Sequence, residues 1–251
     1  MRSLIAGVLF GVLAVGQGVA SAQAARSGPV RVLIVVGGSH DIINLPPILE
    51  ARLAQEGGFE VARLSPPAET PRDLTHLAKL ATLSRQQYDV VLTYMIVPTL
   101  DRANQQALER FLEEGGGMVA LHGSSASFKE SDAWHRMLGG WFLGHLRGTH
   151  PLKVSIVDRS HPVTAGVADF EAVDEEYCHE MTSGVERHVL AQFAARPEGS
   201  LCPNGPADMM WTRQVGRGRV FYSSLGHDAA VWKLPAWQQL AIQGLRWAAG
   251  K

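Results

Sequence analysis

The sequence lacks the features that mark several common functional classes. Its 23 lysines and arginines are balanced by 24 aspartates and glutamates, and the basic residues are scattered. The positive patch that nucleic acid or an anionic membrane surface requires is therefore missing. The Gly37-Gly38 pair after the first apolar run lacks the G-x-G-x-x-G spacing of a dinucleotide site. We expect a small, mostly neutral ligand, no nucleic acid, and neither a nicotinamide nor a flavin cofactor.

The N-terminal apolar run is too short for a membrane span. It extends from Leu4 to Val15, whereas a span needs ~20 residues, and it follows the basic Arg2. The small residues Ala20–Ala22 beyond it form an A-x-A cleavage site. We therefore predict a signal peptide over residues 1–22, a secreted or periplasmic mature protein, and no stable membrane insertion after cleavage. A retained membrane anchor is the alternative.

Cysteine is scarce, since Cys178 and Cys202 are the only two. An oxidising compartment permits a disulfide between them, which would close a loop of about 25 residues and contribute about 3 kcal/mol. Two separate buried thiols are the alternative. The sequence does not give the distance between the two backbones, so both arrangements remain open.

A chain of 251 residues, 46% of them hydrophobic, can bury one large core, and we expect one domain over residues 29–251. Apolar runs at Arg31–Val36, Tyr88–Tyr94 and Met118–Leu121 indicate buried strands, and a helical stripe over Asp101–Glu114 separates the last two. This alternation predicts an α/β fold whose mostly parallel sheet has helices on both sides. Further strands are predicted at Glu60–Leu64, Leu152–Val157, His188–Ala194, Met210–Val215 and Arg219–Leu225, the last two as a hairpin, and further helices after Pro46-Pro47 and over Trp237–Ala248.

Histidines follow three of the predicted strands. His40, His122 and His227 come just beyond apolar runs, and the carboxyl ends of strands in an open parallel sheet form the crevice where ligands bind. His122 stands at the apex of a glycine-rich strand and turn that resembles a nucleophile elbow. Nucleophilic acyl transfer would need Ser124 or Ser125 instead, and we expect neither to serve. A turn with an incidental histidine is the structural alternative.

The acidic segment over residues 174–179 adds further candidates. If the segment is extended, period-two alternation puts Glu175, Tyr177 and His179 on one side and Asp174, Glu176 and Cys178 on the other. One carboxylate, one phenol and one imidazole then share a face. A solvated acidic turn is the alternative.

Five stretches carry a resemblance to a known family. GGGMVALHG, LGGWFLGH, HPVTAGV, DEEY and GRVFYSSLGHD follow one another in the order and approximate spacing of the ThuA-like (trehalose utilisation) family, from about Arg31 to Lys251. The resemblance implies a flavodoxin-like, three-layer fold similar to class I glutamine amidotransferases, and a role in the metabolism of trehalose and related disaccharides, notably oxidised 3-keto forms. His122 would occupy the place of the amidotransferase cysteine and His227 the neighbourhood of its catalytic histidine, which excludes amidotransferase activity.

The resemblance also bears on individual residues. The family pattern D-E-(apolar)-Y is matched by Asp174, Glu175 and Tyr177, whereas Glu176 departs from it, and we expect a more exposed reverse face there. His145 matches the LGGWFLGH motif, and we expect the neighbouring aromatic Phe142 to lie in the core.

We therefore predict an enzyme that acts on a disaccharide or oxidised glycoside by acid–base chemistry. Glu175 or His122 would be the base and His227 the acid, in isomerisation or elimination next to a sugar carbonyl. The predicted substrate-binding residues are His40, His145, Tyr177 and His179.

Two alternatives stay open. His40, His122, Glu175, His179 and His227 offer ligands that zinc or manganese accepts, so hydrolysis by a metal-bound water is one. A non-catalytic carbohydrate-binding protein that uses the same crevice is the other. The sequence does not give the exact substrate or the oligomeric state.

Export gives the first testable prediction. We expect the mature protein to begin close to Gln23, because the small residues at 20 and 22 form the cleavage site. N-terminal sequencing of material recovered outside the cytoplasm measures this. Recovery of the folded protein in the cytoplasm with residues 1–22 intact would contradict it.

Overall fold

The computed structural model describes residues 27–200, 202 and 207–251, so the predicted signal peptide lies outside the described residues. The strands are β1 Val30–Gly38, β2 Phe59–Leu64, β3 Val90–Ile96, β4 Gly117–Leu121, β5 Gly140–His145, β6 His150–Ile156, β7 Phe170–Asp174, β8 Tyr177–Met181, β9 His188–Phe193, β10 Asp208–Val215 and β11 Gly218–Ser223. The helices are α1 Pro46–Glu56, α2 Arg102–Glu113, α3 Asp132–Leu138, α4 Ala229–Trp232 and α5 Pro235–Ala248, with short 3-10 helices η1 Thr75–Thr82 and η2 His122–Ala126. Within the described part of the chain, no helix is both long and apolar enough to cross a membrane.

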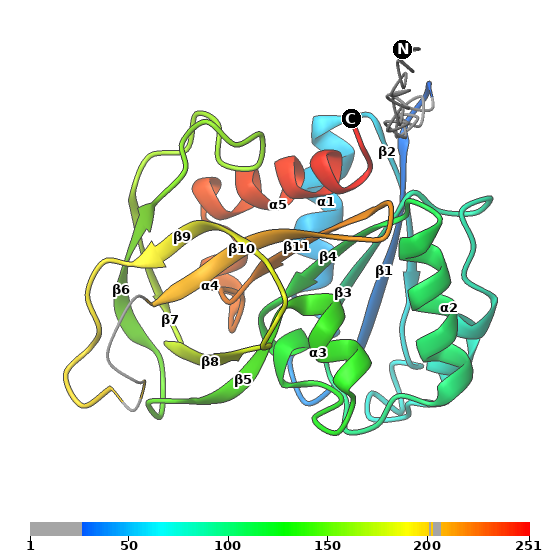
Figure 1. Ribbon diagram of the computed structural model, residues 1–251, viewed down its shortest axis with the longest axis horizontal. Helices are drawn as coiled ribbons and strands as arrows, with labels where there is room; N and C mark the ends of the chain where they lie inside the picture. Colours follow the sequence, from blue (N-terminus) through cyan, green and yellow to red (C-terminus); the bar gives the residue numbers. More distant parts are fainter. Residues whose placement is uncertain (1–26, 201, 203–206) are drawn as a thin grey trace, which may run out of the picture.

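A nine-stranded sheet in the order β2-β1-β3-β4-β11-β10-β9-β6-β7 forms the centre of the molecule (Figure 1). From β2 to β11 all neighbours pair in parallel, and from β11 to β7 all pair antiparallel. The sheet is therefore mixed, and the prediction of a mostly parallel sheet holds only for its first half. The reason is connection length: parallel neighbours need a long crossover, whereas β10 and β11 are joined directly by the turn at Gly216. The predicted hairpin is confirmed.

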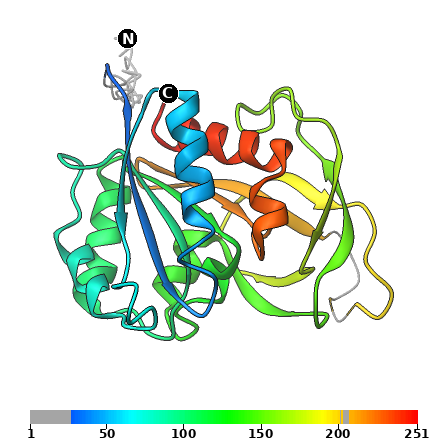
Figure 2. The ribbon, with the colours of Figure 1, turned by 180° about the vertical axis from the view of Figure 1, so that it is seen from behind.

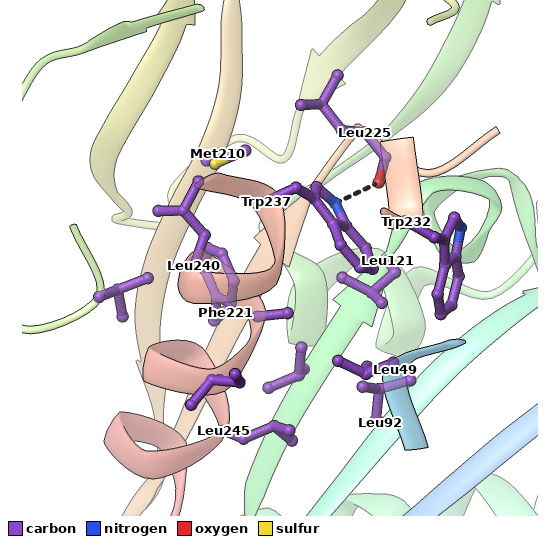
Figure 3. Packing of buried hydrophobic residues seen from close by; sticks show 14 of the residues in the cluster. Leu49, Leu92, Leu121, Met210, Phe221, Leu225, Trp232, Trp237, Leu240 and Leu245 are labelled. Atoms are coloured by element: carbon purple, nitrogen blue, oxygen red, sulfur yellow. Dashed lines mark hydrogen bonds between the residues drawn. The ribbon is translucent and has the colours of Figure 1, made fainter. Parts of the chain in front are cut away.

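The sheet has an apolar core on each face, as alternation along β1 requires. Val32, Ile34 and Val36 belong to one core, which α1, α4 and α5 cover. Leu33 and Val35 belong to the other, which η1, α2 and α3 cover. Figures 1 and 2 show these helices on opposite sides of the sheet, and Figure 3 shows α5 against Phe221 and Leu121. The predicted helices on both sides of the sheet are confirmed.

A separate two-stranded sheet, β5 with β8, was not predicted. It pairs His145 with Tyr177 and Phe142 with His179. The acidic segment is consequently not one extended run, because β7 ends at Asp174 and β8 begins at Tyr177. The chain passes from the large sheet to the small one at Glu175-Glu176, which places Glu175 at the junction.

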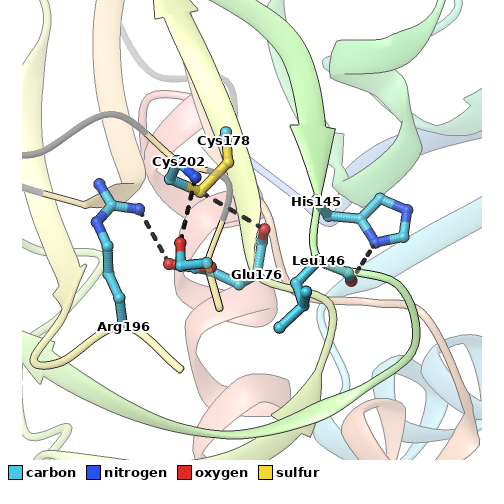
Figure 4. Close-up of a disulfide and its surroundings, with 7 residues drawn as sticks. His145, Leu146, Glu176, Cys178, Arg196 and Cys202 are labelled. Carbon is cyan, nitrogen blue, oxygen red and sulfur yellow. Dashed lines mark hydrogen bonds and ion pairs between the residues drawn. A yellow bond between two sulfur atoms is a disulfide. The ribbon is translucent and has the colours of Figure 1, made fainter. Parts of the chain in front are cut away.

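Cys178 and Cys202 form a disulfide, so the alternative of two free thiols does not apply (Figure 4). The bond lies beside Glu176, which is fully buried and receives a 2.9 Å ion pair from Nη1 of Arg196. The expectation of an exposed face at Glu176 is therefore wrong. A charged side chain tolerates burial when a countercharge reaches it, and here the loop that carries Arg196 and Cys202 supplies one.

We expect a Cys178→Ser, Cys202→Ser double variant to lose about 3 kcal/mol of its free energy of unfolding, because the unfolded chain gains the entropy of an open loop. Urea unfolding of the variant and of wild type measures the difference. Wild type under reducing conditions is the matched control and should lose a similar amount. Alkylation of both cysteines in unreduced, folded protein would contradict the disulfide.

Candidate active site

Three strand ends of the large sheet meet in one cluster of side chains. His40 follows β1, His122 follows β4, and His227 follows β11. Glu175 reaches the same place from the end of β7, and one ligand atom from each of the four lies within 4.8 Å of the others. The predicted convergence is thus present in the structure, while the roles of these residues stay predictions.

His122 is the most enclosed member of the cluster. Its side chain is fully buried, and its backbone has the left-handed φ of 45° that a sharp turn after β4 imposes. Nδ1 lies 2.6 Å from the Ser224 carbonyl oxygen, which can only accept, so Nδ1 carries a proton. Nε2 therefore faces the cluster, 3.0 Å from the Tyr177 hydroxyl and 3.3 Å from Oε2 of Glu175.

Two glycines provide the space that the histidine rings occupy. A Cβ on Gly123 would lie 2.5 Å from Cε1 of His40, and a Cβ on Gly226 would lie 3.1 Å from Cβ of His122. Gly226 also has a positive φ of 146°. These close approaches explain why small residues flank the histidines in both motifs.

Asp174 joins the two loops that carry the rest of the cluster. Its buried carboxylate accepts hydrogen bonds from the backbone amides of Gly226 at 2.7 Å, His227 at 3.2 Å and Glu175 at 2.8 Å. Burial raises the pKa of Asp174, although the bonds from these amides oppose the effect. Asp174 is thus a supporting residue; it matches the family motif, but no role was predicted for it from the sequence.

Glu175 lies between two imidazoles. Its Oε2 atom is 3.3 Å from Nε2 of His122 and 3.2 Å from Nδ1 of His227, and its Oε1 atom is 3.6 Å from Nε2 of His145. Burial by itself raises the pKa of Glu175, but the hydrogen bonds and charges of His122 and His227 together hold it well below its usual range. Glu175 in turn raises the pKa of His227. The pair is therefore an ionised carboxylate beside an imidazole that gains protons readily.

His40 completes the cluster as a neutral ring. Burial, followed by the charges of His122 and His227, lowers its pKa to about 3. Its ring centroid lies 4.8 Å from that of His122 and 5.8 Å from that of His227. At neutral pH His40 thus offers a lone pair and no charge.

One member of the cluster, His227, borders a hollow of about 460 Å³. The other residues that line it are Asp41, Asn44, Leu45, Ile48, Asp228, Ala229 and Lys233. A larger hollow of about 600 Å³ lies beside Asp158, His188 and Arg219. Arg219 pairs with Gly117 at the start of β4, whereas His122 follows the end of that strand. The larger hollow is therefore remote from the clustered histidines, whereas the smaller one lies beside them at His227.

Comparison with known proteins identifies the family of this chain. The model of the ThuA family, described as trehalose utilisation, matches residues 31–248. The chain belongs to the ThuA family. No match was found among curated proteins.

Solved structures show the same fold. A ThuA-like protein from Parabacteroides merdae is 19% identical with a TM-score of 0.74, and the match covers 89% of this chain and 91% of that one. A ThuA-like protein from Bacteroides uniformis is 18% identical with a TM-score of 0.70, over 89% and 93% of the two chains. A Salmonella typhimurium protein described as cytoplasmic is 13% identical with a TM-score of 0.58, over 87% and 99%.

Of the predicted substrate-binding residues in this ThuA-family chain, His40 belongs to the cluster, His145 and Tyr177 lie at its border, and His179 lies outside the group of four. Phe142, which was expected in the core, is half-buried and lies beside Tyr177, with ring centroids 4.4 Å apart and the rings tilted by 49°. His179 was also a candidate metal ligand, but within the described residues it lies outside the group of four whose ligand atoms converge. Its Nε2 atom contacts the Tyr222 hydroxyl at 3.0 Å, and burial lowers its pKa to about 3.

Buried hydroxyls support the cluster from beneath. The Tyr222 hydroxyl donates to the His122 carbonyl at 3.1 Å, and the Tyr94 hydroxyl donates to the Gly226 carbonyl at 3.1 Å. Ser124 donates to the Thr93 carbonyl at 2.8 Å, so its hydroxyl is already engaged. Sequence reasoning missed both tyrosines, although each stands near the end of a predicted strand and could have been noted there.

The lowered pKa of His40 predicts a pH-dependent stability. As pH falls from 6.5 to 4.5 the unfolded chain protonates His40 and the folded protein does not, so the free energy of unfolding falls by up to about 1.4 kcal/mol per pH unit. Across this window the contribution of His227, with its raised pKa, is already complete, and that of Glu175, with its lowered pKa, is not yet lost.

Urea unfolding of wild type and His40→Asn at several pH values, with chelator present, measures this effect. The variant should show the smaller loss of stability on acidification. Curves that stay parallel from pH 6.5 to 4.5 would contradict the buried, neutral His40.

Proposed function

We propose that the protein is an exported enzyme of carbohydrate metabolism that acts on a disaccharide or an oxidised, 3-keto glycoside by proton transfer. The observation that carries this proposal is the position of Glu175, whose carboxylate lies 3.3 Å from His122 and 3.2 Å from His227. A carboxylate between two imidazoles is a suitable arrangement for moving protons near neutral pH. The family description, trehalose utilisation, supports a sugar as the substrate.

The geometry favours particular roles. The pKa of Glu175 is held well below its usual range, which makes the carboxylate a weak base and a good partner for a protonated imidazole. We therefore assign the base to Nε2 of His122, with Glu175 stabilising the imidazolium that forms. His227, whose pKa is raised, is the acid.

The proposed reaction begins at the carbon beside the sugar carbonyl. His122 removes its proton, and the electron pair of the C–H bond moves to give an enolate. In isomerisation His227 protonates the carbonyl oxygen to give an enediol. The hydroxyl on the carbon that lost its proton then returns a proton to His227 as it becomes the new carbonyl, and His122 delivers the abstracted proton to the former carbonyl carbon. In elimination the enolate collapses, the bond to the glycosidic oxygen breaks, and His227 protonates that leaving oxygen.

The fold supports a ligand at this place. The five parallel strands have the order β2-β1-β3-β4-β11, which corresponds to the flavodoxin-like order of a doubly wound sheet, with its crevice at the carboxyl ends of the strands. His40 follows β1 at the point where the strand order reverses. The disulfide supports an oxidising compartment and hence export.

An accessory protein that binds saccharides without converting them is the second candidate. The same hollow would serve it, and half-exposed aromatic side chains such as Phe142 suit sugar rings. It predicts saturable saccharide binding with no turnover.

His122→Asn should lower turnover of a 3-keto-glycoside by at least ~100-fold, because asparagine keeps a polar side chain but cannot exchange protons near pH 7. The measurement is product formation from 3-keto-trehalose, with thermal melts to check folding. His188→Asn, at an exposed histidine that pairs with Asp158, is the matched control and should keep wild-type turnover. Equal turnover by His122→Asn and wild type would remove His122 from the mechanism, and binding without conversion by wild type would favour the accessory protein.

A further inference from the structure

We propose that His40, His122, Glu175 and His227 form a binding site for one divalent transition-metal ion, zinc or manganese. The proposal goes beyond the proposed function, because it concerns the ion and holds whatever the substrate is. Three imidazole nitrogens and one carboxylate oxygen, all within 4.8 Å of one another, make up the donor set. Nitrogen and oxygen ligands of this kind suit zinc and manganese, and a soft thiolate is not needed.

The spacing of the donor atoms fits an ion at their centre. Metal–ligand bonds of about 2.0–2.2 Å place neighbouring ligands of a tetrahedral site about 3.3–3.6 Å apart. Oε2 of Glu175 is 3.3 Å from Nε2 of His122 and 3.2 Å from Nδ1 of His227. Small side-chain rotations would bring the remaining donor pairs, up to 4.8 Å apart, within the same range.

One buried nitrogen of the cluster has unfulfilled bonding capacity. Nδ1 of His40 is shielded from solvent and has no hydrogen bond to any described residue. Nδ1 of His227, by contrast, faces Oε2 of Glu175 at 3.2 Å. A buried polar atom without a partner costs about 1–3 kcal/mol. An ion held by the four residues would offset this cost at His40.

The residues around the cluster orient the donors as an outer shell does in metal sites. Metal-binding histidines usually donate their second ring N–H to a carbonyl or carboxylate, and Nδ1 of His122 does this to the Ser224 carbonyl at 2.6 Å. The amide of Glu175 is fixed by Asp174, which also holds the amide of His227. Since the three histidines stand at ends of strands in one sheet, little reorganisation is needed to bind an ion.

An ion at this place would change the chemistry available. It could polarise a sugar carbonyl or activate a bound water. His122 and Glu175 would then be ligands, and the groups left to move protons beside the cluster would be His145 and Tyr177. A measurement of metal content therefore decides whether His122 and Glu175 act as metal ligands or as the proton-transfer pair.

The test is the metal content of full-length protein purified without metal-affinity steps. We expect about one zinc or manganese ion per chain by mass spectrometry, loss of the ion on dialysis against chelator, and a rise in Tm when Zn²⁺ or Mn²⁺ alone is added back. His40→Asn and His227→Asn should each weaken affinity for the ion at least ~10-fold.

The matched control shares the chemistry but not the position. His188→Asn changes an exposed histidine that pairs with Asp158 and should keep wild-type metal affinity. Wild type that contains less than ~0.1 ion per chain and shows no Tm change with either ion would overturn the proposal, as would an equal loss of affinity in His188→Asn. A bound ion without keto-sugar turnover would support the site and reject the proposed function, whereas turnover by protein that neither contains an ion nor gains stability from added Zn²⁺ or Mn²⁺ would do the reverse.

Discussion

The site depends on one buried carboxylate. Asp174 ends β7 at the antiparallel edge of the large sheet, yet its oxygens hold the amides of Gly226 and His227 beyond the parallel strand β11. The same carboxylate holds the amide of Glu175, so one side chain fixes the backbone of Glu175 relative to that of His227. Burial of Asp174 is costly unless its oxygens are bonded, and the three amides that satisfy it determine the positions of both loops.

In the resulting cluster, neighbouring imidazoles have pKa values shifted in opposite directions. Burial keeps His40 neutral, whereas the Glu175 carboxylate favours protonation of His227. The proposed proton transfer and the proposed metal site would both use this arrangement, since an imidazole without a proton can act as a base or as a ligand. The fold explains why the four side chains converge at the carboxyl edge of the parallel strands.

Local patterns in the sequence predicted much of the fold and the position of the cluster. The apolar runs before His40, His122 and His227 predicted three strand ends, because a strand buried on both faces is continuously apolar. The β10–β11 hairpin is local and was predicted, whereas the β10–β9 and β9–β6 pairings and the small β5–β8 sheet join segments farther apart in the sequence, which leaves no local pattern. Glu176 was misjudged for the same reason, since Arg196 reaches it from another loop. Asp174 was matched to the family motif, but its supporting role was not predicted, because its partners are backbone amides from another part of the chain.

A crystal structure of the protein soaked with a 3-keto-disaccharide tests the central claim, that the four converging side chains form the functional site, most directly. The account predicts that the sugar lies in the hollow beside His227, with its carbonyl or a hydroxyl oxygen within about 3 Å of a polar atom of the cluster or of an ion held there. Sugar bound only in the larger hollow, beside Asp158 and Arg219 at the opposite end of the strands, would contradict it.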